Sequence, residues 1–273
     1  KGLWNSDNLS VSGGSERGTY NVSLGHIYEG GIINQTGLKK YTLRTNLDYK
    51  ATSKLNIGVN IAGTLNQIKD PGAGINWITH IAFREWANDA LQFPDGRWAN
   101  PAWSGREHNA LAYSSDAMGY SKTNDVRLIG TGFAEYQVIP SLSVKGIASV
   151  LQDFNKTDGI LRGVDLYRID PATGVIADNP SSTTVNLQKG SPAVDNVSRG
   201  YFNNTELNYQ LLLNYDKTFG RHSITGLAGL EQRQKRAEFS NLYRRKLLSD
   251  QLDQINAATD INNDGAAGNT TEF

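Results

Sequence analysis

The sequence contains no cysteine among its 273 residues. Without cysteine, neither a disulfide framework nor a thiolate-ligated metal site can form. The absence also fits an oxidising compartment, where free thiols are a liability. Basic and acidic residues each number 27, which gives a formal net charge of zero. Because nucleic-acid-binding proteins usually carry a basic excess, this balance argues against nucleic acid as a partner.

Long hydrophobic runs are missing too. The apolar content is 38% and the mean hydropathy is −0.47. No stretch approaches the roughly 18 consecutive apolar residues that a transmembrane helix needs, so such a helix is excluded. A transmembrane β-barrel is not excluded, because its strands alternate apolar and polar residues. The chain opens on Lys1-Gly2-Leu3-Trp4 without a signal-peptide pattern, and we expect a mature or truncated chain.

What the sequence does have is period-two alternation. Residues 55–62 read LNIGVNIA, with every odd position apolar, and residues 41–50 and 206–216 alternate in the same way. Several such segments have nine or more residues, which suits a tilted membrane-crossing strand better than the shorter strands of soluble proteins. With weaker versions included, eight strands are predicted, near residues 8–14, 20–32, 41–50, 55–65, 126–138, 142–152, 206–218 and 223–234.

The connections between these segments alternate in length. Short turns are expected near residues 15–19, 51–54, 139–141 and 219–222, and long loops near 66–125 and 156–203. Short turns at one end and long loops at the other are typical of outer-membrane barrels.

Tyrosines and polar residues support the same interpretation. Tyrosines on the apolar phase match the aromatic bands at bilayer interfaces, although tyrosine also favours strands in general. The polar phase would suit a wet or plugged lumen better than a hydrophobic core. The tyrosines are Tyr20, Tyr49, Tyr136 and Tyr215 near short turns, with Tyr28 and Tyr41 at the opposite end; the polar phase includes Arg44, Asp48, Lys50, Lys145, Glu206 and Asp216.

Several segments also follow one another in a specific order. They are NLSVSGGS at 8–15, TYNVSLG at 19–25, EGGII at 29–33, TGLKKY at 36–41, RTNLDY at 44–49, FPDGRW at 93–98 and GFAEY at 132–136. Together they resemble the barrel of the SusC/RagA family of TonB-linked (TonB-dependent) outer-membrane transporters, over nearly the whole chain.

The resemblance implies an all-β fold. It would be the antiparallel wall of a transmembrane β-barrel, with about eight strands of a larger barrel of about 22. The plug domain would be absent, and the fragment alone could not transport. The resemblance also implies nutrient uptake across the outer membrane of a Gram-negative bacterium of the Bacteroidetes. The implied partners are a SusD-like surface lipoprotein, the TonB complex reached through a missing N-terminal part, the lipid bilayer, and an oligosaccharide or peptide cargo.

No catalytic motif is found. The sequence has no GK dipeptide for a phosphate loop, no G-x-S-x-G and no H-E-x-x-H, and its four histidines are scattered. We therefore predict no enzyme, no catalytic residue, no cofactor and no metal site. Residues 260–265 imitate the first half of a calcium loop, but Thr271 stands where such a loop needs glutamate. A plain Asx-rich surface loop is favoured there, while a calcium turn of another type stays open.

Tryptophans mark the candidate binding residues. The long loop holds Trp77, Trp86, Trp98 and Trp103, and residues 76–91 have helical spacing. Packing into a folded cap is the favoured role for these rings. Binding of sugar rings or of a lid protein is the alternative. It applies best to Trp98 and Trp103, beside glycine and proline, and then to Trp86.

Two other architectures stay open. One is a complete eight-strand barrel, for which Phe273 would be the terminal aromatic residue. Residues 262–271 lack the alternation of a closing strand, however, so we expect the chain to end inside a loop. The other is a secreted β-rich carbohydrate-binding module or hydrolase, which would require the apolar strand faces to pack on one another.

Overall fold

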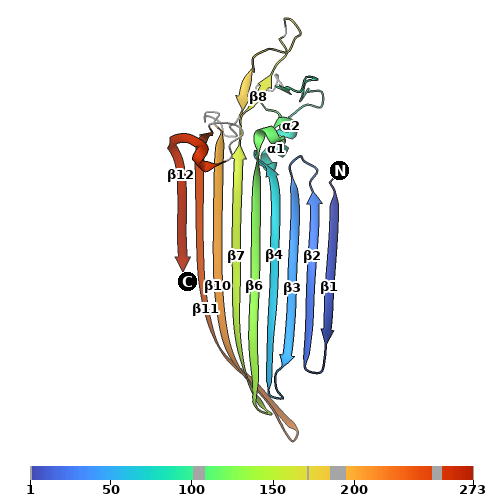
Figure 1. Ribbon diagram of the computed structural model, residues 1–273, viewed down its shortest axis with the longest axis vertical. Coiled ribbons are helices and arrows are strands. Elements are labelled where there is room, and N and C mark those ends of the chain that lie inside the picture. The colour runs from blue at the N-terminus through green and yellow to red at the C-terminus, as the bar shows by residue number, and fades with distance from the viewer. Residues whose placement is uncertain (1, 101–107, 171, 185–194, 248–253, 273) are drawn as a thin grey trace.

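The computed structural model describes residues 2–100, 108–170, 172–184, 195–247 and 254–272. These residues form mainly one antiparallel sheet of nine strands, in the order β1-β2-β3-β4-β6-β7-β10-β11-β12 (Figure 1). Each strand lies beside its neighbour in this order, so the sheet is a meander. The strands are β1 Trp4–Gly14, β2 Gly18–Gly30, β3 Gly37–Lys50, β4 Leu55–Pro71, β6 Gly119–Ile139, β7 Leu142–Leu161, β10 Asn196–Phe219, β11 His222–Leu247 and β12 Ala258–Glu272.

The prediction of an all-β, antiparallel chain is confirmed. Most strands are longer than the alternating segments from which they were predicted. For example, β6 has 21 residues, β10 has 24 and β11 has 26. The long loops are correspondingly shorter than expected. β4 continues to Pro71 and β6 begins at Gly119, while β7 continues to Leu161 and β10 begins at Asn196. The sequence hides these extensions because both faces of the strands carry polar residues there, so the period-two contrast fades.

The ninth strand corrects a prediction. Residues 262–271 were expected to lie in a loop, with a surface loop at 260–265, but both ranges belong to β12, which pairs with β11 from Arg236↔Glu272 to Leu247↔Ala258. The hydrogen bonds between paired strands join backbone groups only, so a strand can form without an apolar face. The adjoining part of β11 also carries polar residues on both faces, such as Glu238 and Asn241.

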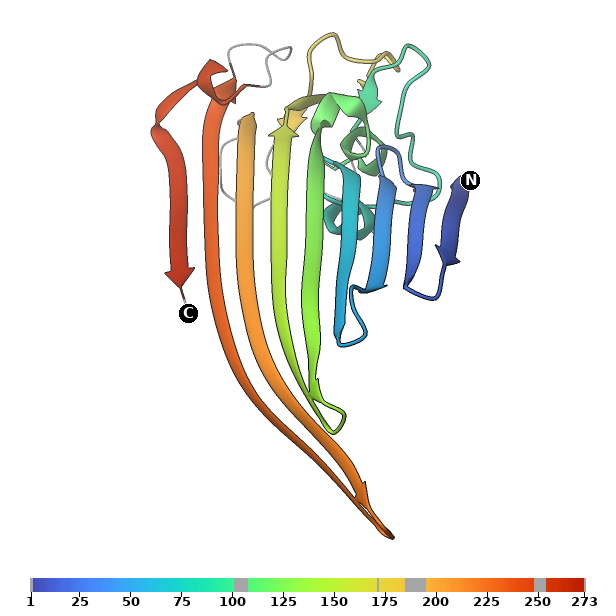
Figure 2. The same cartoon turned by 60° about the horizontal axis from the view of Figure 1, so that its bottom comes forward.

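The connections are sorted by end. Short turns at 15–17, 51–54, 140–141 and 220–221 lie at one end of the sheet, and the described parts of the long segments 72–118 and 162–195 lie at the other. Figure 2 shows the hairpin of β10 and β11 projecting beyond the other hairpins at the short-turn end.

Strand register assigns every side chain to one of two faces. Residues paired across antiparallel strands share a face, so Leu47 lies beside Tyr20 on β2 and Val59 on β4. We call this the apolar face, and the opposite one the polar face. Exposed residues of the apolar face include Leu9, Val11, Tyr20, Leu24, Leu43, Leu47, Tyr49, Ile57, Val59, Ile61, Leu128, Tyr136, Val150, Tyr209, Leu211 and Leu213.

The long segments build a separate cap, which we define as the described residues of 72–118 and 162–184. It contains α1 Ile75–Ala82, α2 Ala110–Tyr113, the 3-10 helix η2 Asp116–Met118, and a small sheet of β5 Trp98–Ala99, β8 Val164–Tyr167 and β9 Ser182–Thr184. A further 3-10 helix, η3 Ile255–Ala257, follows β11. Among the described residues, no helix is long and apolar enough to cross a membrane.

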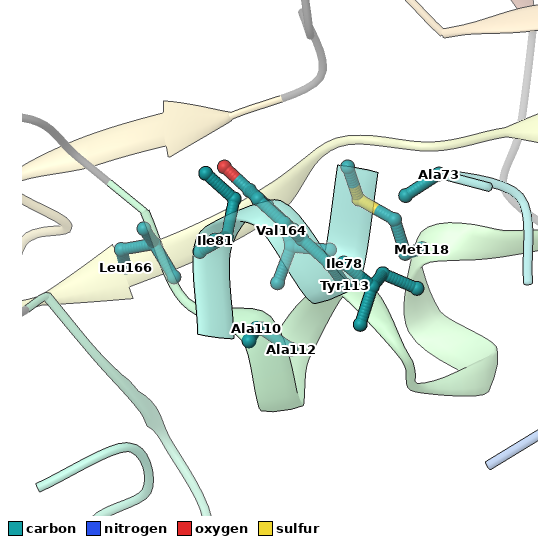
Figure 3. Close-up of a cluster of buried hydrophobic side chains, with 9 residues drawn as sticks. All are labelled: Ala73, Ile78, Ile81, Ala110, Ala112, Tyr113, Met118, Val164 and Leu166. Carbon is teal, nitrogen blue, oxygen red and sulfur yellow. The ribbon is translucent and has the colours of Figure 1, made fainter. Parts of the chain in front are cut away.

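The larger of two buried hydrophobic clusters lies in the cap rather than on the sheet (Figure 3). On α1, Ile78 and Ile81 are three residues apart, so both side chains point into the cluster from one side of the helix. The cluster consists of Ala73, Ile78, Ile81, Ala110, Ala112, Tyr113, Met118, Val164 and Leu166. The helix is shorter than the predicted 76–91, because it ends at Ala82.

We predict that Ile81→Ala loosens the cap. The Ile81 side chain is 1% exposed, and removing a buried isoleucine side chain typically costs about 2–5 kcal/mol through lost burial and the cavity left behind. Amide hydrogen exchange of α1 and α2 in the full-length protein should speed up accordingly. Phe83→Ala is the control because Phe83, just past the same helix, is 91% exposed. Equal loss of protection in both variants would contradict the packing of α1.

Candidate functional site

The polar face carries ion pairs that link neighbouring strands. Arg127 on β6 makes a bidentate contact with Asp153 on β7, with Nε–Oδ1 at 2.6 Å and Nη2–Oδ2 at 3.2 Å. Asn204 on β10 donates to the same carboxylate at 3.3 Å. A two-point contact of this kind fixes the orientation of both groups. Three consecutive strands are therefore joined by side chains as well as by backbone.

A second group continues the polar network toward β11. Arg233 contacts Glu206 through Nε at 2.7 Å and Nη2 at 2.8 Å. Asn208 donates to Glu231 at 2.7 Å. Exposed pairs such as these contribute little stability singly. Their effect is to hold charged groups of both signs at fixed places on the sheet.

Two amides of this network keep unused acceptors. The Oδ1 atoms of Asn204 and Asn208 are buried and accept no hydrogen bond. The same two amides donate to Asp153 and Glu231 through their nitrogens.

Farther along the same face, Phe133 lies directly over Gly58. A Cβ at Gly58 would collide with the ring, so this close approach requires glycine. The ammonium of Lys145 lies 4.3 Å from the Phe133 ring centroid. A cation over an aromatic face is an attractive arrangement. It adds an attractive contact between β6 and β7 on this face.

The cap is held by two polar side chains that sequence motifs did not reveal. Asn109 is fully buried, accepts from Ala112 N–H at 2.8 Å, and donates to the carbonyls of Leu91 and Ala99 at 2.6 and 2.7 Å. Its side chain thereby caps α2 and ties it to two other segments. Glu85 Oε1 accepts from Ala110 N–H at 2.6 Å, so residues following α1 are bonded to the start of α2.

The surroundings of Glu85 shift its titration. Burial raises the pKa of the Glu85 carboxyl, the hydrogen bond from Ala110 N–H opposes this, and the nearby charge of Asp89 adds to the rise. Burial raises the pKa because it disfavours the charged form of the carboxyl. Here this effect is larger than the opposing effect of the hydrogen bond.

The structure separates the tryptophans that were predicted to bind ligand. Trp98 lies on β5 and packs, together with Trp77, against the buried cluster of the cap. Trp86 lies past the end of α1 with its side chain 56% exposed. Trp103 lies outside the described residues. Packing therefore accounts for Trp77 and Trp98, and Trp86 offers an accessible ring; the binding role of all three candidates stays a prediction.

Sequence reasoning missed the residues that organise both regions. Arg127 lies on the polar phase of the predicted strand 126–138 and Asp153 directly follows the predicted strand 142–152, but their pairing depends on register, which one sequence does not fix. Glu85 and Asn109 are ordinary polar residues of a long loop, and only the folded cap brings their partners within reach.

Comparison with known proteins shows which proteins this chain resembles. No family model matches the chain. Among curated proteins, it is 24% identical over 269 residues to TonB-dependent receptor P39 of Formosa agariphila, covering 96% of this chain and 22% of the relative. It is 21% identical over 229 residues to TonB-dependent receptor P3 of the same organism, covering 81% and 20%. The chain thus spans about a fifth of the length of these relatives.

Solved structures give the same answer for the fold. The RagAB peptide transporter superposes with a TM-score of 0.71 at 15% identity, covering 98% of this chain and 28% of that chain. The RagAB peptide importer in its open-open state gives a TM-score of 0.71 at 16% identity, with the same coverage. The fold is therefore that of part of a barrel wall, and the resemblance to SusC/RagA-type TonB-dependent transporters is confirmed. The relatives are named as receptors and transporters, which is consistent with a protein that is not an enzyme.

We predict that Glu85 makes the cap less stable as the pH rises. A carboxyl whose pKa is raised by folding favours the folded state fully below its unfolded pKa, near 4.5, and this contribution is lost as the pH climbs through the raised value. Glu85→Gln keeps the Oε1 acceptor but cannot ionise, so the pH dependence should flatten. Hydrogen exchange of α2 amides, corrected for intrinsic rates, measures it. Glu16→Gln, in an exposed turn, is the control; an unchanged slope in Glu85→Gln would refute the assignment.

Proposed function

We propose that the chain is part of the barrel wall of an outer-membrane TonB-dependent importer. In this proposal it acts with a SusD-like surface lipoprotein to take up oligosaccharides or peptides. The observation that carries the proposal is the contrast between the two faces of one sheet: a continuous band of exposed leucine, isoleucine, valine and tyrosine on one side, and a charged network on the other. Lipid would cover the first face, and the second would line the lumen.

The dimensions of the band support a bilayer. On β4 the apolar face runs from Leu55 to Leu65, which is 11 residues. At about 3.3 Å per residue this is about 33 Å along the strand, and a tilt near 40° gives a height of about 25 Å. That height matches the apolar belt of outer-membrane barrels. Above Leu65 the same face continues with Gln67 and Lys69, which suit water and headgroups.

The two ends of the sheet support an orientation. Short turns need few residues and typically face the periplasm, whereas long connections form extracellular structure. The cap would therefore lie outside the cell. There Phe83 and Trp86 expose aromatic surface next to α1, a feature suited to a lid protein or a cargo. Of the three predicted ligand-binding tryptophans, we favour Trp86 for this role.

Other parts of the full-length protein would supply the rest of the machine. The relatives are about five times as long as their match to this chain. A plug would lie against the polar face, and TonB would be reached through the plug-bearing part. RagAB, whose fold this chain shares, is a peptide transporter, so peptides stand beside oligosaccharides as the candidate cargo.

We predict that Val59→Arg destabilises the full-length barrel. Val59 lies near the middle of the apolar band on β4, and an arginine at the bilayer midplane costs about 2–4 kcal/mol. The free energy of unfolding in phospholipid vesicles, measured with urea, should fall by that amount. Asn60→Arg is the matched control, since its side chain lies on the polar face opposite Asn46, and its effect should be much smaller. Equal effects would refute the assignment of faces.

We also predict that import requires both this protein and TonB. Cells lacking the full-length gene should fail to grow on the cargo, supplied either as an oligosaccharide mixture or as peptides, as sole carbon source. Loss of TonB should give the same defect, because an energised importer does not work passively. Growth on monosaccharides is the control and should be normal. Growth that needs the protein but survives the loss of TonB would indicate a passive pore instead.

A further inference from the structure

A cluster of lysines lies just above the apolar band, on the same face of the sheet. Lys39 on β3 pairs with Gln67 on β4, and Lys69 on β4 pairs with Lys122 on β6. These two rows are adjacent, so the three ammonium groups come from three neighbouring strands. They line a cavity of about 500 Å³. We call it the lysine cavity.

An apolar groove of about 640 Å³ continues below this cavity. Its upper rim is one row beneath Lys39, where Tyr41 pairs with Leu65. Gly63 leaves the groove open, because the missing side chain would have pointed between Leu43 and Leu128. The groove is lined mainly by Leu9, Leu24, Tyr41, Leu43, Leu65, Val126 and Leu128.

The positive charge of the lysine cavity is only partly neutralised. Its lining, within the described part of the chain, includes three lysines and no carboxylate. Lys69 lies 3.7 Å from Asp116, but that carboxylate is almost fully exposed, so water screens the pair strongly. Lys122 lies 4.1 Å from the Tyr120 ring centroid, an interaction that leaves its full charge in place.

The same face on the next strands is better compensated. Asp158 on β7 is the register partner of Lys122, but its carboxylate contacts Lys156 at 3.1 Å and Arg199 at 3.2 Å. That carboxylate is already shared by two cations, so it offers little further compensation to Lys122. The surplus of positive charge is therefore greatest on β3, β4 and β6, where the apolar groove begins.

We infer that the lysine cavity and the groove together bind one lipid with a phosphorylated headgroup from the outer leaflet. The phosphate would lie against Lys39, Lys69 and Lys122, and an acyl chain would fill the groove at Gly63. Cations at the membrane surface attract anionic lipid headgroups, and chain burial adds apolar contact. The inference rests on the proposed function, which places the apolar face in a membrane.

Lipid retention tests the inference. The full-length protein is inserted into phosphatidylcholine nanodiscs that contain a small fraction of lipid A, and bound lipid A is measured by native mass spectrometry. The wild-type protein should retain one lipid A. Lys39→Gln combined with Lys122→Gln should weaken binding about thirtyfold, because each basic residue near an anionic surface contributes about fivefold. Gly63→Leu should also weaken retention, since the new side chain occupies the groove while all charges remain.

Two matched controls keep the result specific. Gly146→Leu makes the same change on the same face, where nothing lies within 4 Å of the added Cβ, and it should bind normally. Lys54→Gln combined with Lys217→Gln removes two lysines at the short-turn end and should also bind normally. Equal retention by all variants would mean an unspecific lipid shell and would overturn the inference.

Two further outcomes are informative. Inorganic phosphate that binds as tightly as lipid A, with no effect of Gly63→Leu, would identify an anion site and overturn the lipid assignment. Failure of the wild-type protein to insert into nanodiscs would overturn the proposed function and this inference with it. Insertion without lipid A retention would overturn the inference alone, so the two failures are distinguishable.

Discussion

Antiparallel pairing is the constraint on which the rest of this structure depends. Side chains alternate between faces along a strand, and paired residues share a face, so one register fixes the surroundings of every side chain in nine strands. A slip by one residue would turn Val59 toward the charged network and Asn60 toward the apolar band. The register thus separates the band from the ion pairs. It also places Arg127 opposite Asp153, and Lys69 opposite Lys122.

Apolar side chains are exposed on the sheet but buried in the cap. The sheet exposes leucine, valine, isoleucine and tyrosine in a band across one face, an exposure that water disfavours and a bilayer favours. The larger cluster of buried apolar side chains instead lies in the cap, where Ile78, Ile81 and Leu166 are covered on all sides. The cap therefore has a buried hydrophobic cluster of its own, separate from the exposed face of the sheet. Asn109 and Glu85 fit this separation, because they join the cap to itself rather than to the strands below it.

The sequence predicts the part of the fold where the two faces differ in polarity. From Leu55 to Leu65 the odd positions are apolar, apart from Gly63, and the strand is evident. From Asn196 to Thr205 on β10 polar residues occur on both faces, and the sequence of β12 mixes polar residues with alanine and glycine, so neither segment alternates and both were missed. The candidate site was predicted less well. Tryptophan composition indicated a folded cap, but the packing of Trp98 and the exposure of Trp86 depend on how the segments meet.

The lysines above the band show why these strand extensions matter. If these strands ended with the apolar band, the positions above the band would belong to loops, whose side chains have no fixed spacing. Because β3, β4 and β6 continue upward in register, Lys39 is held one row above Tyr41, and Lys69 and Lys122 are held two rows above Leu65 and Val126. On β7 and β10 the same extension carries Asp158, which pairs with its cationic neighbours. Identical backbone geometry thus produces a site with three lysines on one part of the wall and, beside it, a partly compensated site where two cations share the Asp158 carboxylate.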